Sequence, residues 1–290
     1  MYITDLTYIE AGIHEELVAY VADQQNYYEQ EGVHVAIRDG RAWDGDRVRQ
    51  TATIGLGRAV LARLTDATPW TVLCASTDRP LFWLLARNPY LSAEELKGRK
   101  IAIHAPHTAP GCFSRIVLRK LGLDPDHDIQ PAVMTPGDYG RHLRKLTDGS
   151  LDAAFVGSTL APEVTAQDNG LRVLAFVGDY FRIPTVGVAV DPTRIAPDDP
   201  AVLALVRASR RALRTIRDEP DLAARYVNAL IPSLTEMQAR QLYEGYVAPY
   251  FTADGRHDPS IATQALSSVA EELGVSTAPD TADIYRTDPP

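Results

Sequence analysis

Two histidines and a candidate helix start lie within one short segment, HAPHTAPG, which begins at His104. Imidazole titrates near neutral pH, so His104 and His107 are candidates for a general base, a metal ligand or a hydrogen-bond partner of a ligand. Thr108 is placed to cap the following helix, whose first turn includes Gly111. The free N–H groups of such a helix start favour a carboxylate, a sulfonate or a phosphate. An ordinary capped helix without a ligand is the alternative interpretation.

Other turns that follow predicted strands carry further candidates, because the carboxyl ends of parallel strands gather at one edge of a sheet. Arg58 follows Gly55-Leu56-Gly57, a short turn that lacks the spacing of a dinucleotide-binding fingerprint. Arg58 is expected either to bind an anionic ligand or to remain in solvent, and Arg79 either to bind the ligand or to pair with the neighbouring Asp78 or with solvent. The full set of candidate ligand-binding residues is Glu10, His14, Gly57, Arg58, Arg79, His104, His107, Thr108, Gly111, Ser158, Thr159 and Tyr180.

Three of these residues are also candidate acids or bases. If the chain is an enzyme, His14, His104 and Glu10 are the residues expected to transfer protons. No metal and no cofactor is expected, because an H-x-x-H pair on a loop lacks the helical spacing of zinc motifs. Cys112, near a helix start, is either an activated thiolate or a buried core residue, and the second interpretation is preferred.

Composition excludes several function classes. The 290 residues are 45% hydrophobic and 23% charged, as in a globular protein of one or two domains. A net charge of -9 and the absence of long basic runs argue against a nucleic-acid partner. No apolar stretch is long enough to insert into a membrane. The first residues lack signal-peptide features, so a cytoplasmic location is expected as written, and an extracytoplasmic one if a signal sequence has been removed.

The periodicity of apolar residues predicts an α/β protein. A strand over 5–10, a helix over 15–31 and a strand over 33–37 form a strand–helix–strand unit with parallel strands. A second α/β layer runs from a strand over 100–104 to a strand over 173–176. After residue 200 the periodic segments are helical and are expected to return to the first domain.

These elements predict two lobes with a ligand cleft between them. Lobe 1 is expected to comprise residues 1–88 and 188–290, and lobe 2 residues 89–187. The chain is expected to cross between lobes near 87–89 and 186–190. Clefts between domains are preferred ligand sites, so the candidate residues are expected to line this one.

Several longer segments resemble a known family. They are YVADQQNYYEQEGVHV, AEELKGRKIAI, LRKLGLDPDHDI, LTDGSLDAAFVGSTLAPEV and PYFTADGRHDPS. In their order and spacing the chain resembles periplasmic solute-binding proteins of the alkanesulfonate, taurine, nitrate and thiamine-pyrimidine-precursor group. The resemblance implies the type 2 fold, in which two open sheets flanked by helices are joined by a hinge and close over a small molecule. It implies a transporter permease as partner only if a signal sequence was removed.

Enzymes with the same fold provide the alternative. The yeast-type pyrimidine synthase has a lysine, a histidine and a cysteine-rich motif that this chain lacks at the matching segments 55–61 and 181–185. Aryl-sulfinate desulfinases have a nucleophilic cysteine in the first cleft turn, where this chain has Glu10-Ala11-Gly12. The predicted function is therefore binding of a small anionic or heteroaromatic molecule. The alternative is a cytoplasmic biosynthetic enzyme or lyase, of the decarboxylase, desulfinase or dehydratase type, which would use His, Glu and Arg residues of the cleft.

Overall fold

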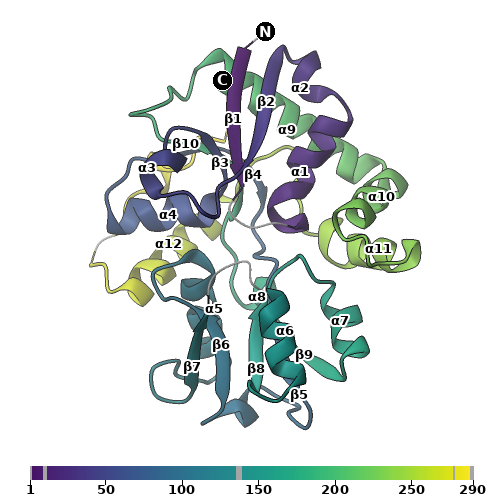
Figure 1. The fold of residues 1–290 in the computed structure, drawn as a ribbon. Helices are drawn as coiled ribbons and strands as arrows, with labels where there is room; N and C mark the ends of the chain where they lie inside the picture. Colours follow the sequence, from purple (N-terminus) through teal and green to yellow (C-terminus); the bar gives the residue numbers. More distant parts are fainter. Residues whose placement is uncertain (1, 9–11, 135–138, 277, 288–290) are drawn as a thin grey trace.

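The computed structural model describes residues 2–8, 12–134, 139–276 and 278–287, and these residues form two five-stranded sheets (Figure 1). The first sheet has the strand order β2-β1-β3-β10-β4, and the second has the order β7-β6-β8-β5-β9. We call each sheet with its helices a lobe. The strands are β1 (Tyr2–Tyr8), β2 (Val33–Asp39), β3 (Ala52–Gly55), β4 (Thr71–Thr77), β5 (Trp83–Arg87), β6 (Lys100–His104), β7 (Gln130–Met134), β8 (Ala153–Val156), β9 (Leu171–Phe176) and β10 (Val186–Val190).

Helices cover both sheets. In the first lobe α9 packs on β1, β2 and β4, and in the second lobe α5 packs on β6 and α6 on β8. The expected α/β fold with two lobes is confirmed. The helices are α1 (Ile13–Gln24), α2 (Tyr27–Gln30), α3 (Gly45–Val48), α4 (Leu56–Thr65), α5 (Ala109–Lys120), α6 (Tyr139–Thr147), α7 (Pro162–Asp168), α8 (Val177–Tyr180), α9 (Pro200–Asp218), α10 (Pro220–Leu230), α11 (Glu236–Leu242) and α12 (Pro259–Leu273), with single turns at Glu94–Leu96, Tyr243–Val247 and Thr281–Asp283.

The first strand–helix–strand unit forms as predicted. β1 and β2 are parallel, and the apolar face of the intervening helix, which includes Leu17 and Val21, is buried. The helix expected over 15–31 is interrupted, because Asn26 adopts a left-handed conformation with φ 56° between α1 and α2. Asparagine is one of the few residues other than glycine that tolerate this conformation.

No helix in the described ranges is long and apolar enough to span a bilayer.

Each sheet contains one strand that runs against its neighbours. β10 is antiparallel to β3 and β4, and β5 is antiparallel to β8 and β9. The lobe boundary expected after residue 88 is therefore wrong, because β5 pairs within the second sheet. The apolar run around β5 suits a buried strand in either sheet, so its composition did not reveal its partner.

Two crossing segments lie side by side between the lobes. The Thr185 N–H donates to the Thr77 carbonyl at 3.0 Å, and the Ile183 N–H donates to the Asp78 carbonyl at 2.8 Å. Arg182 adds an ion pair with Asp78 at 2.5 Å. The first crossing thus precedes β5, earlier in the chain than the expected position near 87–89.

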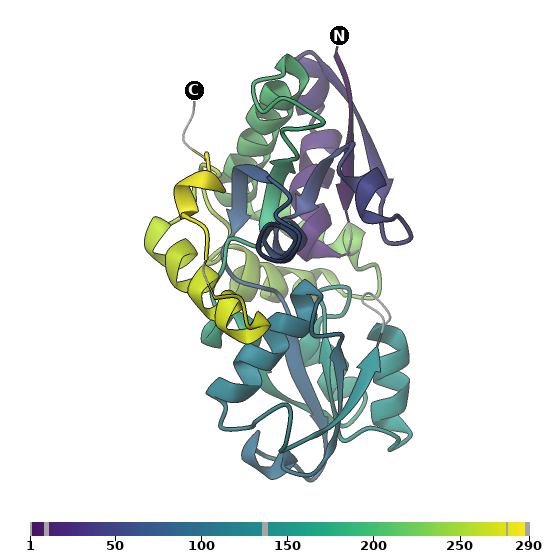
Figure 2. The same cartoon turned by 90° about the vertical axis from the view of Figure 1, so that its left-hand side faces the viewer.

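The C-terminal helices return to the first lobe only in part. α9 packs on the first sheet as expected, whereas α12 contacts both α4 of the first lobe and α5 of the second. Figure 2 shows α12 and the following segment in yellow along one side of the molecule, beside both lobes. The C-terminal segment therefore bridges the lobes.

A second contact between the lobes lies at the start of α1. The His14 N–H in the first turn donates to the Ser158 hydroxyl of the second lobe at 2.9 Å. Gly12 has φ 112°, and an added Cβ would lie 2.8 Å from the Ser158 carbonyl carbon. Ser158 thus satisfies an N–H that a helix start leaves without an internal partner, and it does so from the other lobe.

Replacing Ser158 with alanine should lower the free energy of unfolding by about 1–2 kcal/mol, because the buried N–H of His14 loses its acceptor. Urea unfolding followed by circular dichroism measures this change. Ser267→Ala is the control, since Ser267 is an exposed hydroxyl on α12. Equal stability of the two variants would contradict this role of Ser158.

Candidate ligand-binding cleft

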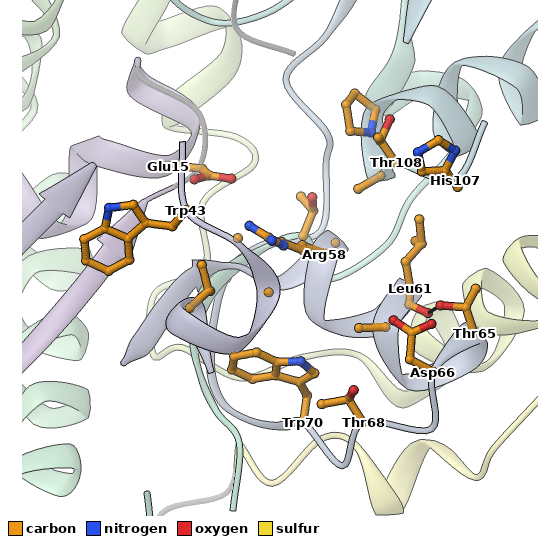
Figure 3. A pocket seen from close by; sticks show the side chains of 18 of the residues that line it. Glu15, Trp43, Arg58, Leu61, Thr65, Asp66, Thr68, Trp70, His107 and Thr108 are labelled. Carbon is orange, nitrogen blue, oxygen red and sulfur yellow. Dashed lines mark hydrogen bonds between the residues drawn. The ribbon is translucent and has the colours of Figure 1, made fainter. Parts of the chain in front are cut away.

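A cavity of about 670 Å³ lies between the lobes (Figure 3). The first lobe contributes the start of α1, the segment from β2 to α3, and α4 with the residues that follow it, and the second lobe contributes the start of α5. This volume lies within the range of small-molecule sites, roughly 300–1,000 Å³. The lining includes His14, Glu15, Arg41, Trp43, Asp46, Arg49, Gly57, Arg58, Leu61, Asp66, Trp70, Phe82, His107, Thr108, Ala109, Pro110 and Phe113.

Among the described arginines that line this cavity, Arg58 is the one without a close partner. Its side chain is partly buried and forms no hydrogen bond or ion pair with another residue in the described ranges. In Figure 3 it reaches towards Glu15. Burial lowers the pKa of Arg58, and the negative charges of Glu15 and Asp44 oppose this change. A guanidinium that has lost water without gaining hydrogen bonds favours an incoming anion.

The other arginines of the lining are paired within the protein. Arg41 forms a two-point ion pair with Asp39, and its hydrogen bonds lower the pKa of that carboxyl group. Arg49 forms an ion pair with the buried Asp191. These pairs leave Arg58 as the positive group best placed to bind a ligand.

The start of α5 has fewer free backbone N–H groups than the sequence predicted. Thr108 caps the helix as expected, and its hydroxyl accepts from the Gly111 N–H at 3.3 Å. Pro110 has no N–H group. Of the first three residues of α5, only Ala109 keeps an N–H group that the cap does not use. The expectation of several free backbone N–H groups is therefore wrong.

His14 lines the cavity with a neutral ring. Its side chain is 3% exposed, and neither ring nitrogen has a hydrogen-bond partner in the described structure. Burial lowers its pKa to about 3. The ring packs edge-on against Phe82, with 5.4 Å between centroids. At neutral pH the ring of His14 is uncharged, and both of its nitrogens are buried.

Aromatic and aliphatic side chains form the rest of the wall. Trp70, 3% exposed, and Phe113, 1% exposed, line the cavity together with Trp43 and Leu61. Trp43, Trp70 and Glu15 were not among the residues predicted from the sequence. The sequence held no local signal for the two tryptophans, because a tryptophan in a cavity wall has the same local pattern as one in the core.

His104 does not reach the cavity. It is fully buried at the end of β6, where its ring packs edge-on against Tyr139 and beside His142, each at 5.7 Å. Successive side chains of a strand point to opposite faces, and this residue points into the second lobe. The expectation that His104 contacts the ligand or acts as a base is therefore wrong. His107, three residues later, lies at the cavity wall.

Arg79 and Tyr180 lie outside the lining of the cavity. Arg79 donates to the Gly178 carbonyl at 2.7 Å and lies over the ring of Tyr250 at 4.7 Å. The Tyr180 carbonyl accepts from Lys120 at 2.7 Å. β10 lies between β3 and β4 in the sheet, so Arg79, after β4, is separated from Arg58, after β3. Strand order, which the sequence did not reveal, decides this difference.

The remaining expected residues have structural roles or lie outside the described residues. An added Cβ at Gly111 would lie 2.0 Å from the Ala105 carbonyl oxygen, so this glycine allows the turn to pack. Ser158 and its neighbour Thr159 contact the start of α1 and do not line the cavity. Glu10 lies outside the described residues, so its expected role stays a prediction.

Gly57 brings the two walls of the cavity together. An added Cβ would lie 2.9 Å from the Cβ of Ala109 and 3.2 Å from the ring of Phe113. The first turn of α4 therefore touches the first turn of α5 across the cleft.

Neither a metal cluster nor an activated thiol is found in the described part of the chain. It holds no group of three or more His, Cys, Asp or Glu side chains placed to bind a metal. Cys112 is fully buried, and burial raises the pKa of its thiol to about 12. The preferred interpretation of Cys112 as a core residue is confirmed.

Comparison with solved structures shows the periplasmic-binding-protein fold. A Candida albicans gene product described as having this generic fold shares 16% identity and a TM-score of 0.74, over 99% of this chain and 97% of that one. The periplasmic aliphatic sulphonate binding protein SsuA of Escherichia coli gives 15% and 0.74, over 100% of this chain and 93% of that one. The desulfurization enzyme DszB gives 15% and 0.74, over 98% and 97%, and a mutant of it was solved with biphenyl-2-sulfinic acid.

Sequence comparison identifies the family. No curated protein is significantly similar to this chain in sequence. The model of the family described as NMT1/THI5 like matches residues 15–223, which is more than half of the chain and includes the crossings and both walls of the cavity. This chain belongs to the NMT1/THI5-like family.

Proposed function

We propose that this protein binds a small organic anion in the cleft between its lobes, as solute-binding proteins do. The observation that carries the proposal is the guanidinium of Arg58, which is partly buried in the cavity without a hydrogen-bonded or ion-paired partner in the described structure. A sulfonate, sulfinate or carboxylate would supply the missing acceptors. The aliphatic sulphonate and the aryl sulfinate bound by SsuA and DszB, which share this fold, support the same ligand class.

The body of the ligand is proposed to be apolar or aromatic. Trp43, Trp70 and Phe113 line the cavity, and aromatic side chains of this kind suit a flat ring or an alkyl chain. His14 adds an uncharged aromatic ring to this wall. The proposed ligand therefore combines one negative charge with a mainly apolar body.

A transporter permease is a partner of this protein only if the protein is exported. A small-molecule ligand is the partner that the cavity supports. If the protein is exported, a transporter permease would receive that ligand.

Catalysis receives less support from the described residues. His14 is the expected base that lines the cavity, and a pKa near 3 makes it a weak base at neutral pH. His104 is buried away from the cavity. Binding without chemistry is therefore the function we propose.

Arg58→Gln should weaken the binding of benzenesulfonate and butanesulfonate about 10- to 100-fold, since hydrogen bonds to charged groups contribute about 1.5–3 kcal/mol. Titration calorimetry measures the dissociation constants. The neutral analogues benzenesulfonamide and butanesulfonamide should bind weakly to both proteins.

Arg63→Gln is the matched control, because Arg63 lies on the same helix and does not line the cavity. It removes the same charge and should leave sulfonate affinity unchanged. Equal losses in the two variants would attribute the effect to net charge. Failure of every anion to bind the unmodified protein would contradict the proposed function.

The buried ring of His14 should make stability depend on pH. Its pKa is about 3 in the folded protein and roughly 6.5 in the unfolded chain, so only the unfolded chain binds this proton between those values. The free energy of unfolding should therefore fall by about 1.4 kcal/mol per unit as the pH decreases from 6 to 4. His14→Gln should remove this part of the pH dependence.

Urea unfolding at pH 7, 6, 5 and 4 measures this effect. The control is His34→Gln, which replaces an exposed histidine of β2 and should keep the pH dependence of the unmodified protein. Identical slopes for the unmodified protein and the His14 variant would show that the ring is protonated without cost, contrary to this account.

A further inference from the structure

We infer that Glu272 on α12 is a positioning residue that holds the second-lobe wall of the cleft against the first lobe. Its effect on ligand affinity rests on the proposed function, whereas its effect on the distance between the lobes does not.

The segment that contains α12 is fixed to the first sheet at both ends. Before α12, the Ala75 N–H of β4 donates to the Gly255 carbonyl at 2.8 Å. After α12, the Val72 N–H of the same strand donates to the Ile284 carbonyl at 2.7 Å. The segment from Gly255 to Ile284, which we call the strap, is therefore hydrogen-bonded to β4 of the first lobe at both ends.

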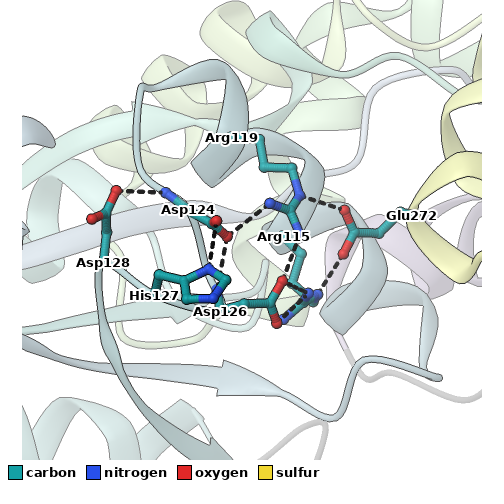
Figure 4. A network of polar contacts seen from close by, with 7 residues as sticks. All are labelled: Arg115, Arg119, Asp124, Asp126, His127, Asp128 and Glu272. Carbon is teal, nitrogen blue, oxygen red and sulfur yellow. Dashed lines mark hydrogen bonds and ion pairs between the residues drawn. The ribbon is translucent and has the colours of Figure 1, made fainter.

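Near its C-terminal end, α12 binds the second lobe through the carboxylate of Glu272 (Figure 4). Glu272 Oε1 accepts from Arg115 Nε at 2.5 Å, and Oε2 accepts from Arg119 Nε at 2.9 Å. The Glu272 side chain is 5% exposed. Two charge-assisted hydrogen bonds at a buried carboxylate are stronger than an exposed ion pair.

The two arginines are also held within the second lobe. Asp126, on the loop after α5, accepts from Arg115 at 2.8 Å and from Arg119 at 2.7 Å. Asp124 accepts from Arg119 at 2.8 Å. The second lobe therefore keeps both guanidinium groups oriented when Glu272 changes. Loss of the carboxylate should release the strap while α5 stays folded.

α5 connects this ion-pair cluster to the cleft. Arg115 and Arg119 lie one turn apart on the helix, so one face of α5 meets α12. Ala109 and Phe113, at the start of the same helix, line the cavity and touch Gly57 of α4. Because a helix moves as a rigid element, fixing its middle to the strap also fixes its first turn at the cavity wall.

The test compares Glu272→Gln with Glu271→Gln, which removes the same charge from the exposed neighbouring residue. Spin labels on Ile37→Cys in β2 and Val133→Cys in β7 report the distance between the lobes by pulsed electron resonance. Both positions are exposed, at 36% and 61%. The native Cys74 and Cys112 are buried, and burial raises the pKa of each thiol to about 12, so neither competes for the label.

Without ligand, Glu272→Gln should give a longer or broader distance distribution than the unmodified protein, and Glu271→Gln should not. The dissociation constant of benzenesulfonate should rise at least tenfold in the first variant only, and saturating benzenesulfonate should restore the shorter distance. An unchanged distance distribution in Glu272→Gln would overturn the inference. If benzenesulfonate binds no variant, the proposed function fails, and the distance measurement still decides the role of Glu272.

Discussion

The contact between the first turns of α4 and α5 is the constraint on which the cleft depends. Gly57 leaves room for Ala109 and Phe113, and a larger residue there would separate the two lobes. Residues that follow these first turns, such as Leu61 of α4 and Phe113 of α5, line the shared cavity. Arg58 follows Gly57 directly, so the residue that allows the contact also positions the cation.

Further connections keep the lobes together around this contact. The crossing segments pair with each other through backbone hydrogen bonds. Ser158 accepts the N–H of His14 at the start of α1, and Glu272 binds two arginines of α5. Each connection joins residues far apart in sequence. Together they enclose a cavity in which the guanidinium of Arg58 has lost part of its water. An anionic group of the ligand would bind there through the positive charge of Arg58.

The fold was largely predictable from the sequence, because it follows local patterns. The apolar face of α1, the cap at Thr108 and the order of strands and helices all depend on residues close together in the chain. β7 was missed because its segment QPAVM shows no clear alternation of apolar residues. The sheet to which β5 belongs depends on distant partners, and periodicity carries no information about them.

The candidate site was predictable only in part, for a related reason. His14, Gly57, Arg58, His107 and Thr108 line the cavity, since they follow or precede elements that end at the cleft. Arg79 and His104 also follow strands, but strand order and side-chain direction place them elsewhere. Trp43 and Trp70 were missed because nothing local distinguishes a tryptophan of a cavity wall from one in the core.

The most direct test of the central claim is a crystal structure of the protein with benzenesulfonate. The account predicts electron density for the sulfonate in the cleft, with its oxygens within hydrogen-bond distance of the Arg58 guanidinium and the ring against the aromatic wall. Density for benzenesulfonate outside the cleft, or in the cleft without a contact to Arg58, would contradict the account.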